Sequence, residues 1–281
     1  MKRWKLFVLT ALVIVLIVST IAYVKERKSN LRVYFLDVGQ GDAIYIRTPG
    51  GHDMLIDGGP SGIVLRRLSE VMPWYDRSVD VVVETHPDAD HIGGLPDVLG
   101  RYQVGVFMEP GIDSDNAIDD EIARVRKARG VNQVVARRGQ VVDFGDGSYF
   151  RILFPDIDVT DFKDTNDASV VGQMVFGSTS VMLTGDSPMA VENHLVETDG
   201  TGLQSTLLKA GHHGSRTSSG KEYVETVAPQ WAIFSAGKDN RYGHPHAETV
   251  AIFQSLGIPM INTANVGTIR FVSDGKTFKH E

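Results

Sequence analysis

The 281-residue chain contains no cysteine. A disulfide framework and every thiolate metal site are therefore excluded. Exported bacterial proteins often avoid free thiols, but cytosolic proteins can also lack cysteine, so this absence says little about the compartment.

The chain also lacks an excess of positive charge. Its formal net charge is −7, with 28 basic and 35 acidic residues. Residues 1–28 hold six of the basic residues and one acidic residue, so the remainder has 22 basic and 34 acidic residues, a charge of −12. General attraction to nucleic acid requires the opposite sign. Any nucleic-acid substrate must therefore be held by a local basic patch or by bound metal ions.

One long apolar run stands out, LFVLTALVIVLIVSTIAYV at residues 6–24. A helix of this length, rising ~1.5 Å per residue, just crosses a hydrocarbon layer of ~30 Å. Lys2, Arg3 and Lys5 precede the run, which by the positive-inside rule leaves the short N-terminus in the cytoplasm. We predict a signal anchor over residues 1–28 with a transmembrane helix at 6–24. The rest of this single-pass membrane protein would lie in the extracytoplasmic envelope of a bacterial cell.

A cleaved signal peptide is the alternative, because Thr20-Ile21-Ala22 is an acceptable cleavage site. Cleavage near Ala22 would give a secreted protein. However, the apolar run exceeds the usual core of a signal peptide, and basic residues follow it directly. A buried core helix is disfavoured because no face of the segment is polar.

The remaining chain is strand-rich, with helices interspersed in both halves. The expected strands are LRVYFLDV, AIYIRT, HDMLID, VDVVVETH, SVVGQMVFG, STSVMLTGD, LQSTLLKAGH, QWAIFSAG and a terminal GTIRFVS, and residues 104–160 are expected to form further short strands around a charged helix. The expected helices lie at 62–72, after Gly93-Gly94, near 117–129, at 187–198, near 218–227 and at 246–256. This pattern predicts an α/β fold, an αββα sandwich of two sheets packed face to face with helices outside, over residues 29–281.

The strongest functional signal is THPDADHIGG at residues 85–94, directly after an apolar strand. His86, Asp88, Asp90 and His91 place four potential ligands within six residues. Adjacent Asp90 and His91 cannot share one direction on a strand or helix, so we expect a loop that splays them. Such a loop suits two metal ions about 3.5–4 Å apart with a bridging hydroxide, since metal lowers the pKa of water to about 7. A helix-capping turn is the alternative, but a cap needs only one aspartate.

This segment resembles the signature of the metallo-β-lactamase superfamily, His-x-His-x-Asp-His after a strand, with Asp88 replacing the second histidine. More closely, the chain resembles the extracytoplasmic hydrolase domain of ComEC-type bacterial competence proteins. The matching segments are LDVGQGDA (36–43), LIDGG (55–59), THPDADHIGG (85–94), LTGD (183–186), LLKAGHHGS (207–215) and NRYGHPH (240–246). The resemblance implies a metallo-β-lactamase fold and a hydrolase with two divalent ions, Zn²⁺ or Mn²⁺. Asp88 makes the site harder and shifts preference toward Mn²⁺ or Mg²⁺, although Zn²⁺ still binds such sets well.

The resemblance also implies individual roles. Asp186 would be the carboxylate shared by both metals, although a carboxylate following a strand can also cap the helix at 187–198. His244 would be the last ligand. Many superfamily members have another histidine before the Thr-Gly-Asp strand, whereas this chain has NDAS at 166–169.

His212 or His213 would fill that gap. The two follow each other at the expected end of a buried strand, where adjacent side chains point oppositely, so one is expected to be a ligand. We prefer His213; the other would orient a loop or donate a proton to the leaving group. The expected metal ligands are thus His86, Asp88, Asp90, His91, Asp186, His213 and His244, and the expected catalytic residues are Asp90, Asp186, His212 and His213.

Four further residues are candidates for support or substrate binding. Asp57, in the LIDGG segment, is expected to orient the histidine loop from outside the ligand sphere. Lys209, Ser215 and Arg241 are candidates to hold an anionic substrate, although each is as often a simple surface residue.

The favoured function is a phosphodiesterase or nuclease acting on DNA outside the membrane. The alternatives are hydrolysis of another envelope substrate, namely a phosphocholine ester, a nucleotide or a β-lactam, and a non-catalytic envelope module with a relic metal site. An anionic phosphodiester and, through the N-terminal helix, the membrane are the expected partners.

Overall fold

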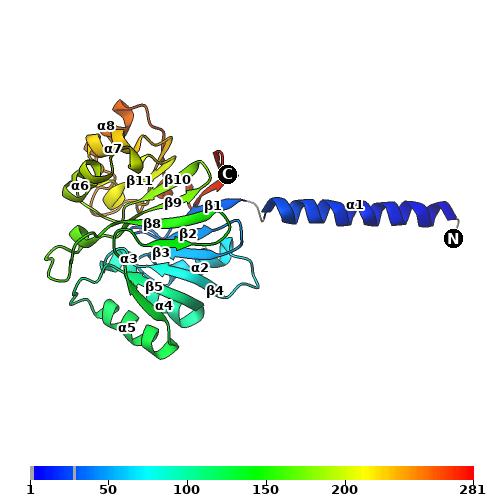
Figure 1. The fold of residues 1–281 in the computed structure, drawn as a ribbon, viewed down its shortest axis with the longest axis horizontal. Coiled ribbons are helices and arrows are strands. Elements are labelled where there is room, and N and C mark those ends of the chain that lie inside the picture. The colour runs from blue at the N-terminus through cyan, green and yellow to red at the C-terminus, as the bar shows by residue number, and fades with distance from the viewer. Residues whose placement is uncertain (1–2, 28–29) are drawn as a thin grey trace.

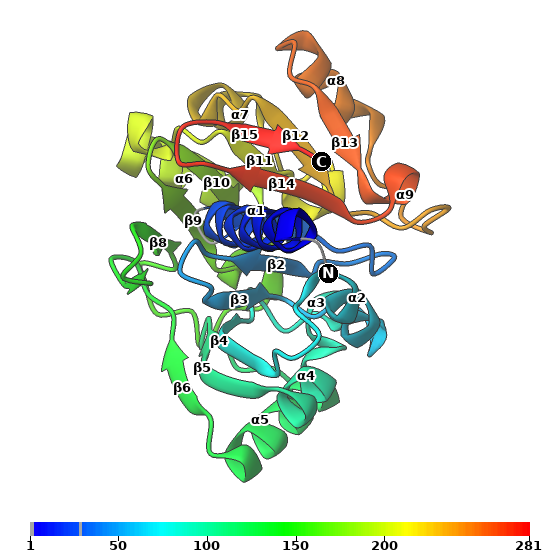
Figure 2. The same ribbon diagram turned by 90° about the vertical axis from the view of Figure 1, so that its right-hand side faces the viewer.

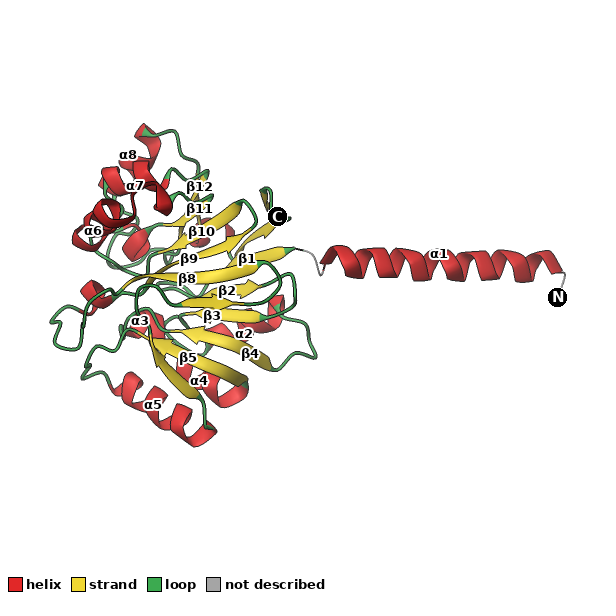
Figure 3. Cartoon of the chain, viewed as in Figure 1, coloured by secondary structure: helices red, strands yellow, loops and turns green. Residues whose placement is uncertain are grey.

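Two β-sheets packed face to face, with helices on both outer faces, make up the body of the protein in a computed structural model that describes residues 3–27 and 30–281. Figure 3 shows the strands as two inner layers and most helices outside them. The predicted αββα sandwich is therefore confirmed.

The first sheet has eight strands in the spatial order β15-β14-β1-β2-β3-β4-β5-β6. Their bounds are β1 Leu31–Phe35, β2 Ile44–Arg47, β3 Asp53–Ile56, β4 Ser78–Val83, β5 Gln103–Glu109, β6 Asn132–Val135, β14 Ile269–Ser273 and β15 Phe278–His280. β3, β4, β5 and β6 run parallel to one another. Because β14 pairs with β1, the C-terminal strands (red) lie beside the N-terminal strands (blue) in Figure 2.

The second sheet has seven strands in the order β13-β12-β11-β10-β9-β8-β7. Their bounds are β7 Val141–Asp143, β8 Ser148–Phe154, β9 Val171–Phe176, β10 Thr179–Leu183, β11 Leu207–Lys209, β12 Trp231–Phe234 and β13 Met260–Asn262. β10, β11, β12 and β13 are parallel.

Helices cover the outer faces and fill the connections. Those following strands of the first sheet are α2 Ile63–Val71, α3 Ala89–Ile92, α4 Leu95–Arg101 and α5 Ala117–Arg129. Those of the second half are α6 Met189–Asp199, α7 Lys221–Val227, α8 Ala247–Ser255 and α9 Thr263–Val266, with 3₁₀ turns η1 Thr165–Ala168, η2 Gly200–Leu203 and η3 Gly211–Gly214.

Strand parity explains why β4 reads as a continuous apolar run. Val81 and Val83 face the core between the sheets, whereas Val82 faces the helices on the outside. In the second sheet Leu207 faces inward and Leu208 outward, so both sheets are buried on both faces. Each fully buried side chain of this size contributes roughly 1.5–3 kcal/mol.

Several predicted elements differ from the structure. Two short strands, β13 and β15, were not predicted, and the strand at 269–273 is therefore not the last one. Three-residue strands are too short to show an alternating pattern. β15 nevertheless follows Asp274-Gly275, a hairpin sequence in which Gly275 has a φ of 84°.

The N-terminal helix is α1 Arg3–Arg27, whose described side chains are exposed. It is the one helix of the described chain that is long and apolar enough to cross a membrane, over Arg3–Thr20. That property is compatible with an anchor and with a signal sequence. The predicted boundary at residues 28 and 29 lies outside the described residues.

A buried glutamate holds the loop that follows β11. Glu192, on α6, is fully buried, and its two carboxylate oxygens accept hydrogen bonds from the backbone N–H of Ser219 (2.7 Å) and Gly220 (2.8 Å). Ser219 has a φ of 58°, and its hydroxyl in turn accepts a hydrogen bond from Gly211 N–H at 3.0 Å. Glu192 thus fixes the segment that carries His212 and His213.

We predict that Glu192 makes stability depend on pH. Burial raises the pKa of Glu192 from 4.5 to about 7, against the lowering effect of the two backbone N–H groups. Between these values the unfolded chain loses its proton first, so the free energy of unfolding falls as pH rises from about 5 to 7, by on the order of 3 kcal/mol. Denaturant unfolding of the full chain measures this fall. Glu192→Gln should give a flatter profile, and parallel profiles for both proteins would contradict the assignment.

Candidate metal centre

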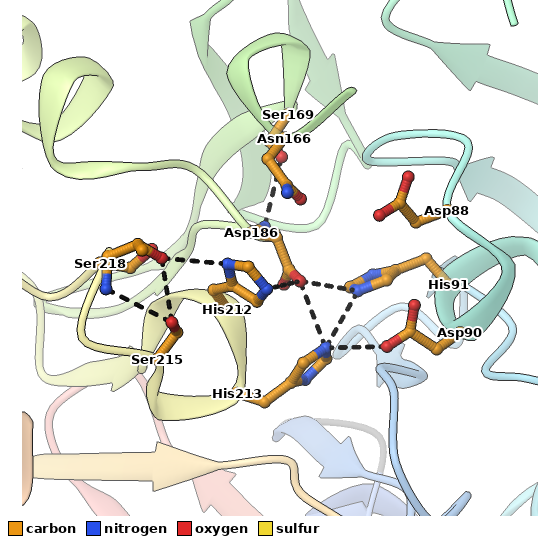
Figure 4. Close-up of polar contacts among 12 residues, drawn as sticks. Asp88, Asp90, His91, Asn166, Ser169, Asp186, His212, His213, Ser215 and Ser218 are labelled. Carbon is orange, nitrogen blue, oxygen red and sulfur yellow. Dashed lines mark hydrogen bonds and ion pairs between the residues drawn. The ribbon is translucent and has the colours of Figure 1, made fainter. Parts of the chain in front are cut away.

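The loops that carry the predicted site residues leave the carboxyl ends of β3, β4, β10, β11 and β12, which meet at one rim of the sandwich. Ligands commonly bind at the carboxyl ends of strands in α/β sheets. Figure 4 shows side chains from both sheets turned toward one another at this rim.

The THPDADH segment contains a one-turn helix, α3, rather than the predicted loop. Asp90 and His91 diverge because successive residues on a helix are rotated by about 100°. The backbone of Gly41 lies against this turn, where a Cβ atom would come within 2.1 Å of the Asp90 carbonyl oxygen. Gly41, with a φ of 126°, therefore permits the close approach of the Asp42 loop to α3.

His212 and His213 were expected at the end of a strand, but β11 ends at Lys209 and both histidines lie in η3. Their φ values are 48° and 54°, in the left-handed region. Their rings therefore do not point to opposite faces, and both turn toward Asp186 (Figure 4).

The centre of the cluster is the Asp186 carboxylate. Its Oδ2 lies 3.3 Å from His91 Nε2, 3.3 Å from His213 Nε2 and 3.7 Å from His212 Nε2. Asp90 Oδ2 lies 3.3 Å from His213 Nε2. Helix α6 has Pro188 at its N-cap position, so the alternative helix-capping role of Asp186 is not found.

Asp57 organises two of these imidazoles from behind. Its carboxylate accepts hydrogen bonds from Thr85 N–H, Thr85 Oγ1 and His91 Nδ1, each at 2.8 Å. Because the hydroxyl of Thr85 donates to Asp57, it accepts from Nδ1 of His86 at 3.0 Å. Both rings therefore present Nε2 as the free nitrogen when neutral.

The same pattern recurs at the other two histidines. His213 Nδ1 donates to the Ser235 carbonyl oxygen at 2.8 Å. Thr217 Oγ1 donates to Ser215 Oγ at 3.0 Å and lies 3.2 Å from His212 Nδ1, from which it accepts. Four imidazoles are thus held at Nδ1 by outer partners, with Nε2 directed at the cluster, as in sites that ligate metal through Nε2.

His86 is fully buried, and its Nε2 lies 3.7 Å from Oδ2 of Asp88, which is at the solvent-exposed side of the cluster. Asp88 is partly exposed and accepts a hydrogen bond from Thr165 Oγ1 at 2.5 Å. Above Asp186, Asn166 comes from η1, and Ser169 Oγ accepts from the backbone N–H of Asp186 (Figure 4). Asn166 therefore occupies the place at which the resemblance implied a further histidine.

Several buried polar atoms at this rim have no hydrogen-bond partner among the described residues. They are His86 Nε2, Asp186 Oδ1, Asp42 Oδ1, Asn166 Oδ1 and His244 Nδ1. Unpaired buried polar atoms are destabilising, and here they are nitrogen and oxygen atoms of ligand-forming types. The donor set therefore fits divalent metal, and Asp42, His91, Asp186 and His213 offer ligand atoms all within 4.8 Å of one another.

Lys209 occupies the inner side of the cluster. Its side chain is fully buried, forms an ion pair with Asp42, donates to the Gly185 carbonyl oxygen at 3.1 Å and lies 3.6 Å from Asp186 Oδ1. The prediction that Lys209 holds a substrate does not fit this burial. Because Lys209 already compensates the charge of Asp42, this carboxylate is less available to a metal ion than that of Asp90, which lies 3.3 Å from His213 Nε2.

The electrostatics of the cluster follow from burial and from the proximity of its charged groups. Burial opposes the charge of His91 and of His213, but the Asp186 carboxylate outweighs it and raises the pKa of both rings well above the usual value. Burial lowers the pKa of His86, which is therefore neutral. Burial disfavours ionised Asp186, yet His213, His91 and Lys209 lower its pKa well below the usual value.

The loop after β12, residues 235–246, lies on the solvent-exposed side of the cluster, which we call the mouth of the site. The ring of His244 lies 5.5 Å from that of His212, and Tyr242 stacks on it at 5.6 Å. Arg241 is exposed, covers the Tyr242 ring at 4.8 Å and feels the charge of Asp90. Ser215, by contrast, is buried, so its predicted substrate contact does not fit the structure.

Two residues near the site had no predicted role. Glu192 and Thr165 gave no sequence signal, because each acts across loops distant in the chain. Asp42 lies in the GQGD turn, and its pairing with an internal lysine could not be read from spacing.

The comparisons with known proteins agree with this geometry. The profile described as "Metallo-beta-lactamase superfamily" matches residues 36–231. The chain is 30% identical to ComE operon protein 3 of Bacillus subtilis over 265 residues, 86% of this chain and 33% of that protein. It is 30% identical to Competence protein ComA of Neisseria gonorrhoeae over 254 residues, 88% of this chain and 33% of that protein. The chain thus spans about a third of the length of these relatives.

The fold is also that of a solved structure, the metallo-beta-lactamase fold protein YhfI of Bacillus subtilis. The TM-score is 0.59 at 12% identity, covering 87% of this chain and all of that one. The predicted resemblance is confirmed by the profile match over most of the chain. This protein belongs to the metallo-beta-lactamase superfamily.

Proposed function

We propose that the protein is a metal-dependent phosphodiesterase that cleaves DNA outside the cytoplasmic membrane. The observation that carries the hydrolase assignment is the convergence of three Nε2 atoms, those of His91, His212 and His213 from both sheets, on the Asp186 carboxylate. A pair of divalent ions there would activate water and neutralise charge on a phosphoryl group.

The geometry supports two ion positions that share Asp186. One would be held by Asp90, His91 and His213, because His91 and His213 each lie 3.3 Å from Asp186 Oδ2 and Asp90 lies 3.3 Å from His213. The other would be held by His86, Asp88 and His212.

His244 would complete the set from the mouth. Burial lowers the pKa of His212, and burial together with His213 lowers that of His244 to about 4. Neutral imidazoles fit ligands better than proton donors.

The choice of an anionic substrate rests on the mouth of the site. Arg241 is an exposed cation beside an otherwise acidic cluster, and Tyr242 next to it offers an exposed ring. Aromatic rings stack on unpaired bases, and arginine binds phosphate. The acidic remainder of the domain supports local rather than general binding of nucleic acid.

The choice of DNA follows from the relatives. A relative that is 30% identical to this chain is named Competence protein ComA, and we take DNA as the substrate from this resemblance to competence proteins. The apolar helix α1 fits an anchor that holds the hydrolase domain outside the membrane.

We predict that Asp186→Asn lowers turnover of bis-p-nitrophenyl phosphate and single-stranded DNA by more than about a hundredfold, since removing an outer partner of a ligand already lowers activity 10–100-fold. Bound metal, measured by atomic emission, should fall in parallel. The exposed Asp161→Asn serves as the matched control and should retain both. Substantial turnover by Asp186→Asn, with normal metal content, would show that this carboxylate is not shared by the ions.

We predict that Arg241→Ala raises KM for DNA about fivefold with kcat unchanged, as expected for loss of one exposed charge contact of ~1 kcal/mol. Lys279→Ala, an exposed cation on β15, is the control and should leave KM unaltered.

The substrate class is tested by assaying the same full chain with nitrocefin. Turnover of nitrocefin with no cleavage of either phosphodiester would replace the proposed substrate class.

The orientation of α1 has its own test. A phosphatase reporter fused after residue 281 should be active only outside the membrane, and the protein should remain in the membrane fraction after alkaline washing. Reporter activity with full release into the soluble envelope fraction would identify α1 as a cleaved signal sequence instead.

A further inference from the structure

A second group of carboxylates lies apart from the metal centre, on the helix-covered face of the first sheet. Glu84, Glu109 and Asp119 each offer one oxygen atom, and these oxygens all lie within 4.8 Å of one another. The group borders a hollow of about 240 Å³ that Glu109 and Asp119 line.

Strand parity and register bring the first two acids together. Glu84 directly follows β4, and Glu109 ends β5, whose Met108 is paired with Val83. Val82 and Phe107, two residues before each acid, face the outer helices, so Glu84 and Glu109 face them too. Two carboxylates thus stand side by side at the same ends of neighbouring parallel strands.

Asp119 approaches from helix α5. It lies one turn before Ile122, which is buried against the sheet, so both project from the same face of the helix. Burial together with the charges of Glu109 and Asp120 raises the pKa of Asp119 to about 6. Three acidic side chains this close together therefore repel one another when they are ionised.

Glu84 is the residue that marks the cluster as more than an exposed acidic patch. Its side chain is 2% exposed, and its Oε2 has no hydrogen-bond partner among the described residues. Glu109 accepts a hydrogen bond from Gln133, and Arg126 acts on Asp119 from the wall of the hollow. Burying a carboxylate without a partner is strongly unfavourable.

We propose that Glu84, Glu109 and Asp119 bind a calcium ion, at a site separate from the histidine-rich centre. The ligands are oxygen atoms only, which suits a hard cation and disfavours Zn²⁺. Calcium takes 6–8 oxygen ligands at 2.3–2.6 Å in irregular geometry, so opposite ligands lie up to about 5 Å apart. The hollow leaves room for water to complete the shell.

The ion has a structural consequence for the metal centre. It joins the end of β4, two residues before His86, to β5 and to the first turn of α5. Next to it, Asn116 at the N-cap of α5 donates to the Pro87 carbonyl oxygen at 2.7 Å. Calcium would thus fix α5 against the loop that carries His86 and Asp88.

The test is calorimetric titration of Ca²⁺ into the full chain in detergent, after Zn²⁺ has filled the histidine-rich centre and free metal has been removed. The wild type should bind one Ca²⁺ per chain and gain thermal stability. Glu84→Gln and Asp119→Asn should each weaken Ca²⁺ binding at least tenfold and lose the thermal gain. Asp115→Asn, an exposed aspartate just before α5, is the matched control and should behave as the wild type.

The isosteric Glu84→Gln replaces a buried ionisable group by a neutral one of the same shape, so without Ca²⁺ it should be at least as stable as the wild type. Asp119→Asn, on the more open side of the cluster, answers the question even if the Glu84 variant does not fold. Absence of saturable Ca²⁺ binding in the Zn²⁺-loaded wild type, or equal affinity in wild type and Asp119→Asn, would overturn the proposal. Neither result depends on whether the histidine-rich centre cleaves phosphodiesters.

Discussion

The buried carboxylate of Asp186 is the contact that joins the two halves of the sandwich chemically. Its Oδ2 meets His91 from the first sheet and His213 from the second at the same distance of 3.3 Å. Each imidazole is fixed from behind, His91 by Asp57 and His213 by the Ser235 carbonyl. The site therefore depends on the relative position of two sheets, which the apolar core between them sets.

Local backbone geometry then aims the side chains. A one-turn helix separates Asp90 from His91, and left-handed φ values at His212 and His213 turn both rings to one side. Non-glycine residues held at positive φ are strained by of order 1–3 kcal/mol and persist only where surrounding contacts impose them. Here those contacts include the Glu192 carboxylate, which holds the Ser219–Gly220 backbone, and Ser219, which holds Gly211.

Sequence reasoning reached the fold and most of the cluster because both depend on local patterns. The apolar runs predicted β4, β9 and β10, and the charged segment predicted α5 at its observed bounds. Prediction from the sequence failed where the position of a side chain depends on partners that are distant in the chain. Lys209 reads as a solvent-exposed cation, yet it is the last residue of β11 with the inward parity of Leu207, and its ammonium group meets Asp42. The direction of His212 and His213 required backbone angles that no periodicity encodes.

Charge balance limits how the rim can be occupied. Five carboxylates lie at the cluster or directly behind it, namely Asp42, Asp57, Asp88, Asp90 and Asp186. Asp57 accepts three hydrogen bonds, which favour its ionised form, although burial raises its pKa. Lys209 balances one of the five carboxylates, so the two divalent ions that we propose would meet up to four ionised carboxylates when all imidazoles are neutral.

Without those ions the same charge must be met by protons. The raised pKa values of His91 and His213 show where two of them reside. Binding of the proposed ions would therefore displace protons from these two rings and replace ion pairs by ligand bonds. Lys209 would not be exchanged in this way, because its ammonium is enclosed by Asp42, Asp186 and the Gly185 carbonyl. It would keep Asp42 compensated with or without metal, which would leave Asp186, His91 and His213 as the groups whose partners change.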